Sequence, residues 1–145
     1  FSLSDVARLD TLVTVVDAEQ FVRDFHSADY LADRGQAAGP DDRRPLVGLL
    51  GEQVEFADVI IINKTDRVRP EGLRQVRRML RALNRDAELI DARRARVPLR
   101  KILGTGRFDF LKAQLAPGWM QELRGEHRPE TEAYGITSFV FRSRR

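Results

Sequence analysis

The sequence predicts an α/β fold in which helices cover a parallel β-sheet. Two β-branched apolar runs, at residues 9–16 and 59–62, and a third short run at residues 88–91 have the length and composition of strands. Segments with helical spacing separate these runs, and such alternation is typical of βαβ units. The run at 59–62 stops at a polar tetrapeptide, which therefore lies at the carboxyl edge of the sheet, where ligands bind in open α/β folds.

The elements of the first half follow in order. Residues 9–16 predict a buried strand, and residues 18–25 predict a short helix with its apolar side chains on one face. A polar stretch with Gly and Pro at residues 33–45 predicts a loop. Residues 46–56 predict a helix that leads into the second strand.

Beyond the second strand, Pro70 suits the first turn of a helix, and Asn84 is a suitable residue to end it. Between them runs an apolar stripe at three- to four-residue spacing, formed by Leu73, Val76, Leu80 and Leu83. Short helices are predicted at residues 99–103 and 108–115, on either side of a turn at residues 104–106.

Composition limits the class of protein. The chain has 145 residues, 32% of them charged, and a formal net charge of +3, which is ordinary for a globular domain. It has no cysteine, so disulfides and cysteine-based metal sites within this chain are excluded, which fits a reducing cytoplasm. No apolar run approaches membrane-spanning length, so no membrane partner is expected.

The tetrapeptide Asn63-Lys64-Thr65-Asp66 carries the most informative chemistry. Asn-Lys-x-Asp at the end of a buried strand is the guanine-reading motif of P-loop GTPases. The carboxylate of Asp66 can accept two charge-assisted hydrogen bonds from the N1–H and N2 amine of guanine, an adjacent donor pair that adenine lacks. The stem of Lys64 can lie over the base, and Asn63 can tie the loop together. A strand followed by an ordinary polar turn is the alternative.

A phosphate cradle is absent from this sequence. Nucleotide hydrolases of this class place Gly-x-x-x-x-Gly-Lys-Ser/Thr at a helix N-terminus, and no such stretch occurs here. The chain also begins with Phe1 rather than Met, so we expect it to be part of a longer protein.

The chain resembles the CobW-like family of metal-handling P-loop GTPases in four stretches that occur in family order. They are LDTLVTVVDA at 9–18, EQVEFADVIIINKTD at 52–66, ILGTGRFD at 102–109 and YGITSFVFR at 134–142. The resemblance implies a partial P-loop GTPase fold at 1–115, a linker at 116–133 and, at 134–145, the first strand of an α+β C-terminal domain.

The resemblance also implies a function. Members of this family bind and hydrolyse GTP with Mg²⁺ and deliver a transition metal, zinc or cobalt, to client proteins. Of the family's functional residues, only Asn63, Lys64 and Asp66 carry over, and the loop at Asp91 and Ala92 occupies the place of a second contact with the base. The family's P-loop and Cys-x-Cys-Cys motif are not in this sequence.

Several alternatives stay open at this point. Asp17 could lie near Mg²⁺ or the base, or it could cap the helix that follows it. His26 and His127 have no partner spacing, so surface or structural roles are expected. A non-catalytic interaction module derived from a GTPase half is the second reading of the whole chain.

A third reading concerns nucleic acid. Arginines at helical spacing, namely Arg74, Arg77, Arg78, Arg81 and Arg85, could form a nucleic-acid face. The near balance of acidic and basic residues favours a solvated helix face instead.

Overall fold

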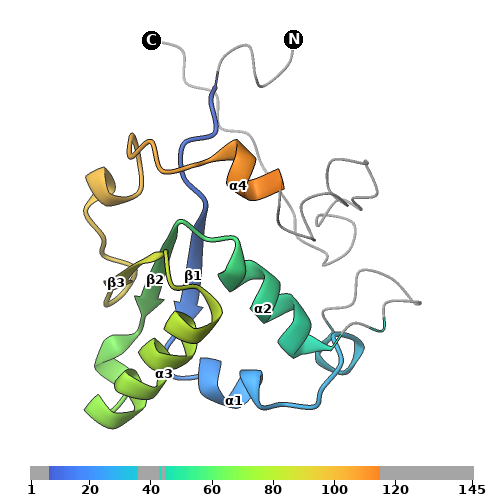
Figure 1. Ribbon diagram of the computed structural model, residues 1–145. Helices are drawn as coiled ribbons and strands as arrows, with labels where there is room; N and C mark the ends of the chain where they lie inside the picture. The colour runs from blue at the N-terminus through green and yellow to red at the C-terminus, as the bar shows by residue number, and fades with distance from the viewer. Residues whose placement is uncertain (1–6, 36–42, 44, 115–145) are drawn as a thin grey trace, which may run out of the picture.

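The computed structural model describes residues 7–35, 43 and 45–114. Within them, three parallel strands form one sheet in the order β1-β2-β3 (Figure 1). The strands are β1 Val13–Asp17, β2 Val59–Asn63 and β3 Glu88–Asp91. The predicted α/β class, with a parallel sheet flanked by helices, is confirmed.

Strand β2 is the centre of the sheet and is buried on both faces, as its wholly apolar sequence predicts. Val59, Ile60 and Ile62 are 0% exposed, and Ile61 is 6% exposed. Parallel strands are joined by crossover connections, and these connections lie over the faces of the sheet and bury its central strands. The buried central strand therefore fixes where the chain leaves the sheet after Ile62.

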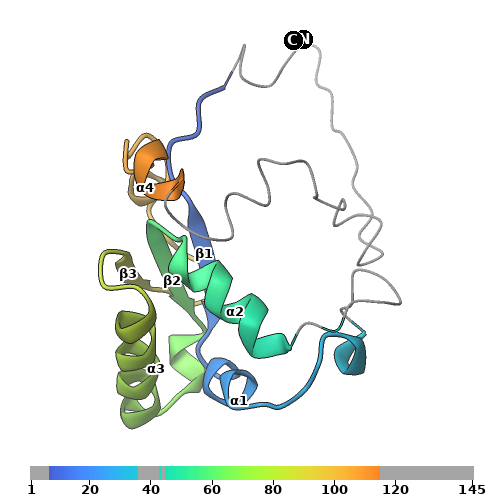
Figure 2. The same ribbon diagram turned by 45° about the vertical axis from the view of Figure 1, so that its right-hand side comes forward.

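One face of the sheet is covered by α1 Phe21–Phe25, α2 Leu46–Glu55 and α3 Pro70–Leu83 (Figures 1 and 2). The main core forms there from buried side chains of all these elements: Val16, Phe21, Val54, Ile60, Ile62, Val76 and Leu80. Helix α3 has Pro in its first turn and ends before Asn84, and two residues of its predicted stripe are 0% exposed. The predicted bounds and apolar face of this helix are confirmed.

The other face is covered only in part. Val59, Ile61 and Ala92 pack there against Ile90, Val97 and Ile102, which come from β3 and the segment after it. This segment does not reach β1, where Val13 and Val15 remain 38% and 61% exposed.

The prediction of a buried strand at residues 9–16 is therefore wrong in two respects. The strand begins only at Val13, and its apolar residues on one face meet solvent. Among the described residues, β1 pairs with β2 alone, so it is an edge strand with a free outer side. A β-branched run looks the same in sequence whether its strand is central or lies at an edge.

The chain returns to the amino end of β1 after β3. A 3-10 turn at Leu99–Lys101 precedes a tight turn, where Gly104 and Gly106 have φ of +65° and +62°. The main-chain amides of Thr105 and Gly106 both donate to the Asp10 carboxylate at 2.8 Å. Helix α4 then spans Phe110–Gln114. The turn at 104–106 is confirmed, whereas both short helices are shorter than predicted.

Some sequence predictions fall outside the described residues. They are residues 36–42 and 44 of the polar loop, the linker at 116–133, the strand at 136–142, and His127. At the start of that loop, Asp33 and Arg34 belong to the 3-10 turn Ala32–Arg34.

Candidate functional site

The carboxyl edge of the sheet brings together the residues that the sequence singles out. In the strand register, Asp17 at the end of β1 lies beside Asn63 at the end of β2, and Asp91 at the end of β3 lies beside Ile62. The tetrapeptide 63–66 therefore begins at the middle of three neighbouring strand ends. This is the position that the sequence predicted for it.

Asn63 fixes the start of the loop to both neighbours. Its side-chain Oδ1 accepts a hydrogen bond of 2.9 Å from the main-chain amide of Ala95, in the loop after β3. Its main-chain carbonyl accepts one of 3.0 Å from the amide of Ala18, just after β1. The expected role of Asn63 in tying the loop together is thus seen in its contacts.

Thr65 adds two further bonds on the β3 side. Its amide and its hydroxyl both donate to the main-chain carbonyl of Ala92, at 3.2 and 3.1 Å. The Ala92 amide in turn donates to the Ile62 carbonyl at 2.8 Å. Because Thr65 lies between Lys64 and Asp66, these bonds restrict where both of its neighbours can go.

Lys64 has a left-handed backbone, with φ of 60° and ψ of 33°. This conformation costs a non-glycine residue about 1 kcal/mol or more, and such residues concentrate at functional sites. The ammonium Nζ of Lys64 donates to the Asp17 carboxylate Oδ2 at 2.5 Å. The side chain therefore runs from the β2 loop across to the end of β1.

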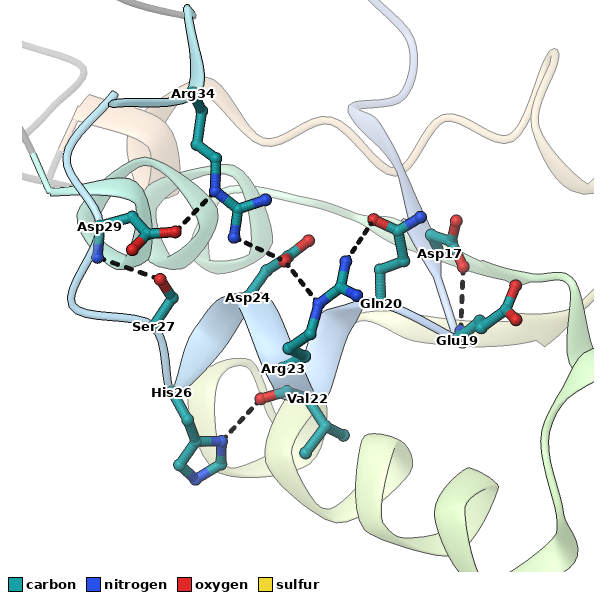
Figure 3. Close-up of polar contacts among 10 residues, drawn as sticks. All are labelled: Asp17, Glu19, Gln20, Val22, Arg23, Asp24, His26, Ser27, Asp29 and Arg34. Atoms are coloured by element: carbon teal, nitrogen blue, oxygen red, sulfur yellow. Dashed lines mark hydrogen bonds and ion pairs between the residues drawn. The ribbon is translucent and has the colours of Figure 1, made fainter. Parts of the chain in front are cut away.

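Asp17 has a second partner in its own chain segment. Its Oδ1 accepts from the amide of Glu19 at 2.9 Å, which closes a turn before α1 (Figure 3). Partial burial raises the pKa of the Asp17 carboxyl, but hydrogen bonds from Lys64 and from the Glu19 amide outweigh it and leave that pKa below its usual value. The carboxylate is therefore charged at neutral pH.

The interpretation of Asp17 as a helix cap is wrong. Helix α1 begins at Phe21, later than predicted, and its N-cap is Gln20, which makes no side-chain capping bond. Asp17 lies too far before that helix to cap it, because a turn closed by the Gln20 amide and the Asp17 carbonyl at 3.2 Å comes between them. Aspartate favours both roles, so composition alone does not separate them.

Asp66 lies in the 3-10 turn Thr65–Arg67 and is exposed. Within the described part of the chain, no hydrogen bond or ion pair engages its carboxylate. Both oxygens thus lack a partner among these residues, and the preceding Asn63 and Thr65 are held by bonds to the segments that follow β1 and β3. This arrangement can present two acceptors to a paired donor.

Asp91, the last residue of β3, and Ala92, which follows it, both have engaged polar groups. The carboxylate of Asp91 pairs with Arg77 of α3. Ala92 is buried, and its carbonyl receives the two bonds from Thr65. Beyond them, Arg94 and Ala95 are both left-handed, with φ of 51° and 55°.

Sequence reasoning missed two relationships at this site. It did not foresee the Asp17–Lys64 ion pair or the bond from Ala95 to Asn63. The signal for the first was present, because residues that end adjacent parallel strands must lie side by side. Nothing in the composition of residues 93–96 indicated consecutive left-handed residues.

The other polar candidates have local partners. His26 donates from Nδ1 to the Val22 carbonyl at 2.7 Å on the exposed side of α1 (Figure 3). On α3, Arg74 pairs with Glu71, and Arg81 donates to the carbonyls of Arg85 and Ala87. These contacts are those of a solvated helix face.

The described residues do not form a metal centre. No three His, Cys, Asp or Glu side chains in that part of the chain are close enough together to hold an ion. At the sheet edge, Asp17 and Asp91 already pair with Lys64 and Arg77, so they do not fit as a Mg²⁺ site. Within the same residues, no helix is both long and apolar enough to cross a membrane.

Comparison with known proteins identifies relatives. The chain is 44% identical over 144 residues to the zinc-regulated GTPase metalloprotein activator 1 of Dictyostelium discoideum, an alignment that covers 99% of this chain and 30% of the relative. It is 33% identical over 104 residues to the zinc chaperone CobW of a Sinorhizobium species, covering 68% of this chain and 29% of the relative.

A zinc chaperone CobW of Pseudomonas aeruginosa is 28% identical over 106 residues, covering 70% of this chain and 28% of the relative. The chain thus spans less than a third of the length of these curated relatives. No solved structure gives a significant match.

Residues 1–91 match the nucleotide-binding domain described as CobW/HypB/UreG. The match includes β1, β2 and β3, and with them Asp17 and the tetrapeptide 63–66. The chain belongs to the CobW/HypB/UreG family of nucleotide-binding domains.

Proposed function

We propose that this chain supplies the guanine-recognition part of a GTP-binding and GTP-hydrolysing metallochaperone. Asn63, Lys64 and Asp66 bind the base, and the loop at Asp91 and Ala92 borders it. The observation that carries the proposal is the open carboxylate of Asp66, presented on a loop whose preceding residues are bonded to both neighbouring strands.

The chemistry of guanine supports this assignment. A carboxylate that accepts from both N1–H and the N2 amine matches guanine and leaves adenine without a donor pair. Restraint of the loop before binding reduces the entropy lost when the base docks. Asn63 and Thr65 provide that restraint through Ala95 and Ala92.

The metal in the proposal is a substrate that the protein carries. The names of the relatives, a zinc chaperone and a zinc-regulated metalloprotein activator, support zinc rather than cobalt as the cargo and a metal-dependent client protein as the recipient. We assign no metal ligands to the described residues, and no step of the reaction is assigned to Mg²⁺. A cysteine-free chain suits a cytoplasmic protein.

The domain plan is part of the same proposal. Residues 1–115 form the second half of the GTPase domain, 116–133 a linker, and 134–145 the beginning of the C-terminal domain. Two features of β1 support a further neighbour: Val13 and Val15 are exposed on one face, and among the described residues the outer edge of the strand has no pairing partner.

A nucleotide panel tests base recognition in the protein at its full natural length. Fluorescent GDP should bind, and ADP should compete at least about 10⁴-fold more weakly, since a site built for paired hydrogen bonds rejects an analogue that lacks the donors. In Asp66→Asn, preference should move from guanine to xanthine nucleotides. Glu52→Gln, on the exposed side of α2, is the matched control and should leave the ranking of nucleotide affinities unchanged. Equal binding of GDP and ADP would overturn the proposal.

The second candidate is a non-catalytic interaction module, favoured by the lack of a phosphate cradle in the sequence. Such a module should be folded and monomeric as the 145-residue chain alone. Circular dichroism and sedimentation of that chain distinguish the two. Self-association through the uncovered β1 supports the GTPase part, whereas a stable monomer supports the module.

A further inference from the structure

We infer that Asp17 is a positioning residue for Lys64, holding the lysine side chain in the place where it covers the guanine base. The inference rests on the proposed function, since Lys64 must contact the base for its placement to matter. It adds a specificity element from a different strand, outside the Asn-Lys-x-Asp motif.

The backbone brings the two residues together independently of their side chains. Asp17 and Asn63 are register partners at the ends of β1 and β2, and the Ala18 amide donates to the Asn63 carbonyl at 3.0 Å. Lys64 follows directly, and its left-handed conformation turns the chain sharply out of β2. The Nζ to Oδ2 distance of 2.5 Å completes a bridge between the two strand ends.

Asp17 is suited to act as the fixed partner. Its other oxygen is held by the Glu19 amide at 2.9 Å, so the carboxylate has a defined orientation (Figure 3). Its side chain is 28% exposed and that of Lys64 is 38% exposed, so the pair is partly shielded from water. Aspartate has a short side chain with few rotamers. Holding it in place at the end of a strand therefore costs less conformational entropy than holding a second long side chain opposite Lys64 would.

The benefit to binding is preorganisation. Lysine is flexible, and immobilising such a side chain on binding weakens affinity by about two- to tenfold. Because Lys64 is paired with Asp17, its side chain is already largely immobilised before the nucleotide binds. The aliphatic stem between the fixed Cα and the fixed ammonium is then available as an apolar cover for the base.

A double-mutant cycle on GDP affinity tests this in the protein at its full natural length. Asp17→Asn keeps an acceptor for the Glu19 amide but loses the charge, and Lys64→Met keeps the stem but loses the ammonium. We expect Asp17→Asn to weaken GDP binding by about two- to tenfold. In the Lys64→Met background the same change should have no further effect, because the partner is already absent.

The cycle separates positioning from a merely structural role. A role of Asp17 in the turn before α1 alone would give the same loss in both backgrounds, and this result would overturn the inference. Unchanged or tighter GDP binding by Asp17→Asn would also overturn it. The charge-matched control Glu88→Gln, at the opposite end of the sheet, should bind GDP like the wild type.

The outcome is independent of the test of the proposed function. If the wild-type protein does not prefer GDP over ADP, guanine recognition itself fails. If it prefers GDP and the cycle shows no coupling between positions 17 and 64, only the positioning role of Asp17 fails.

Discussion

The side-chain amide of Asn84 donates to the main-chain carbonyl of Val54, thirty residues earlier in the chain, at 2.9 Å. The same Nδ2 lies 2.8 Å from the carbonyl of Ala57, and Oδ1 accepts from the Ala87 amide at 3.0 Å. Asn84 is 8% exposed. One side chain thus joins the end of α2, the end of α3 and the approach to β3.

Replacing Asn84 should therefore destabilise the fold. Asn84→Ala removes the side-chain donor to the buried carbonyl of Ala57 and one of the two donors to that of Val54, which costs about 2–4 kcal/mol in the free energy of unfolding. Asn84→Asp should cost as much, because its carboxylate would face carbonyl oxygens. Urea unfolding measures both. Gln75→Ala on the exposed side of α3 is the control, with an expected change within about 0.5 kcal/mol. A change that small in Asn84→Ala would contradict the role given to these bonds.

The Asp10 carboxylate should make stability depend on pH. Hydrogen bonds from the Thr11 hydroxyl and from the Gly106 and Thr105 amides hold the pKa of Asp10 below its usual value. A depressed folded-state pKa contributes stability above the unfolded value of about 3.9, and this contribution is lost as pH falls through the folded-state pKa.

Asp10→Asn should accordingly be less stable than the wild type at pH 7, and the difference should narrow as the pH is lowered below about 4. Denaturant unfolding across this range measures the narrowing. The two amides donate to different oxygens of the Asp10 carboxylate, and asparagine has only one side-chain oxygen. Part of the loss of stability in Asp10→Asn should therefore persist at acid pH. A difference that stays constant from pH 7 to acid would show that the charge of Asp10 does not matter.

The left-handed backbone at Ala95 predicts a stabilising glycine. Ala95→Gly removes the Cβ conflict at φ of 55° and should raise stability by about 0.5–1 kcal/mol. The same substitution at Ala82, inside α3, should lower stability by a similar amount. Opposite signs from one chemical change, measured by thermal unfolding, test the conformation directly. Destabilisation at both positions would place Ala95 in an ordinary conformation.

The exposed outer side of β1 predicts self-association of the isolated chain. Val15 is 61% exposed, and the outer edge of its strand is unpaired within residues 7–35, 43 and 45–114, so Val15→Lys should reduce association, as charged residues do on natural edge strands. Sedimentation velocity over a concentration series measures the effect. Gln75→Lys, with the same added charge on α3, should leave association unchanged. If both variants reduced self-association equally, the effect would come from the added charge in general and not from the edge of β1.

The parts of the fold that sequence predicted well are those where burial and helix signals agree. Strand β2 is apolar at each core position and is buried on both faces, and α3 carries a start residue, an apolar stripe and a stop. The edge position of β1 was not predictable from composition, because β-branched residues occur in central and edge strands alike. Short helices such as α1 are set by turns and tertiary contacts, so their bounds were missed.

At the candidate site, the sequence placed the residues but not their partners. Spacing located Asn63, Lys64 and Asp66 at the edge of the sheet. The partners of Asn63 and Lys64 come from residues 32 and 47 positions away, which only the strand register brings close. Guanine binding by these residues stays a prediction.

The bonds between Asp10 and the turn at Thr105 and Gly106 also bear on biosynthesis. They join residues 95 and 96 positions apart, with Asp10 before β1 and its two partners after β3. A ribosome adds about 5–20 residues per second, so roughly 5–20 seconds pass between synthesis of Asp10 and of its partners. The segment before β1 is thus made several seconds before the two amides that bind its Asp10 carboxylate. Until Thr105 and Gly106 have been synthesised, the Asp10 carboxylate lacks both of these amide donors, and the amino end of β1 lacks their restraint.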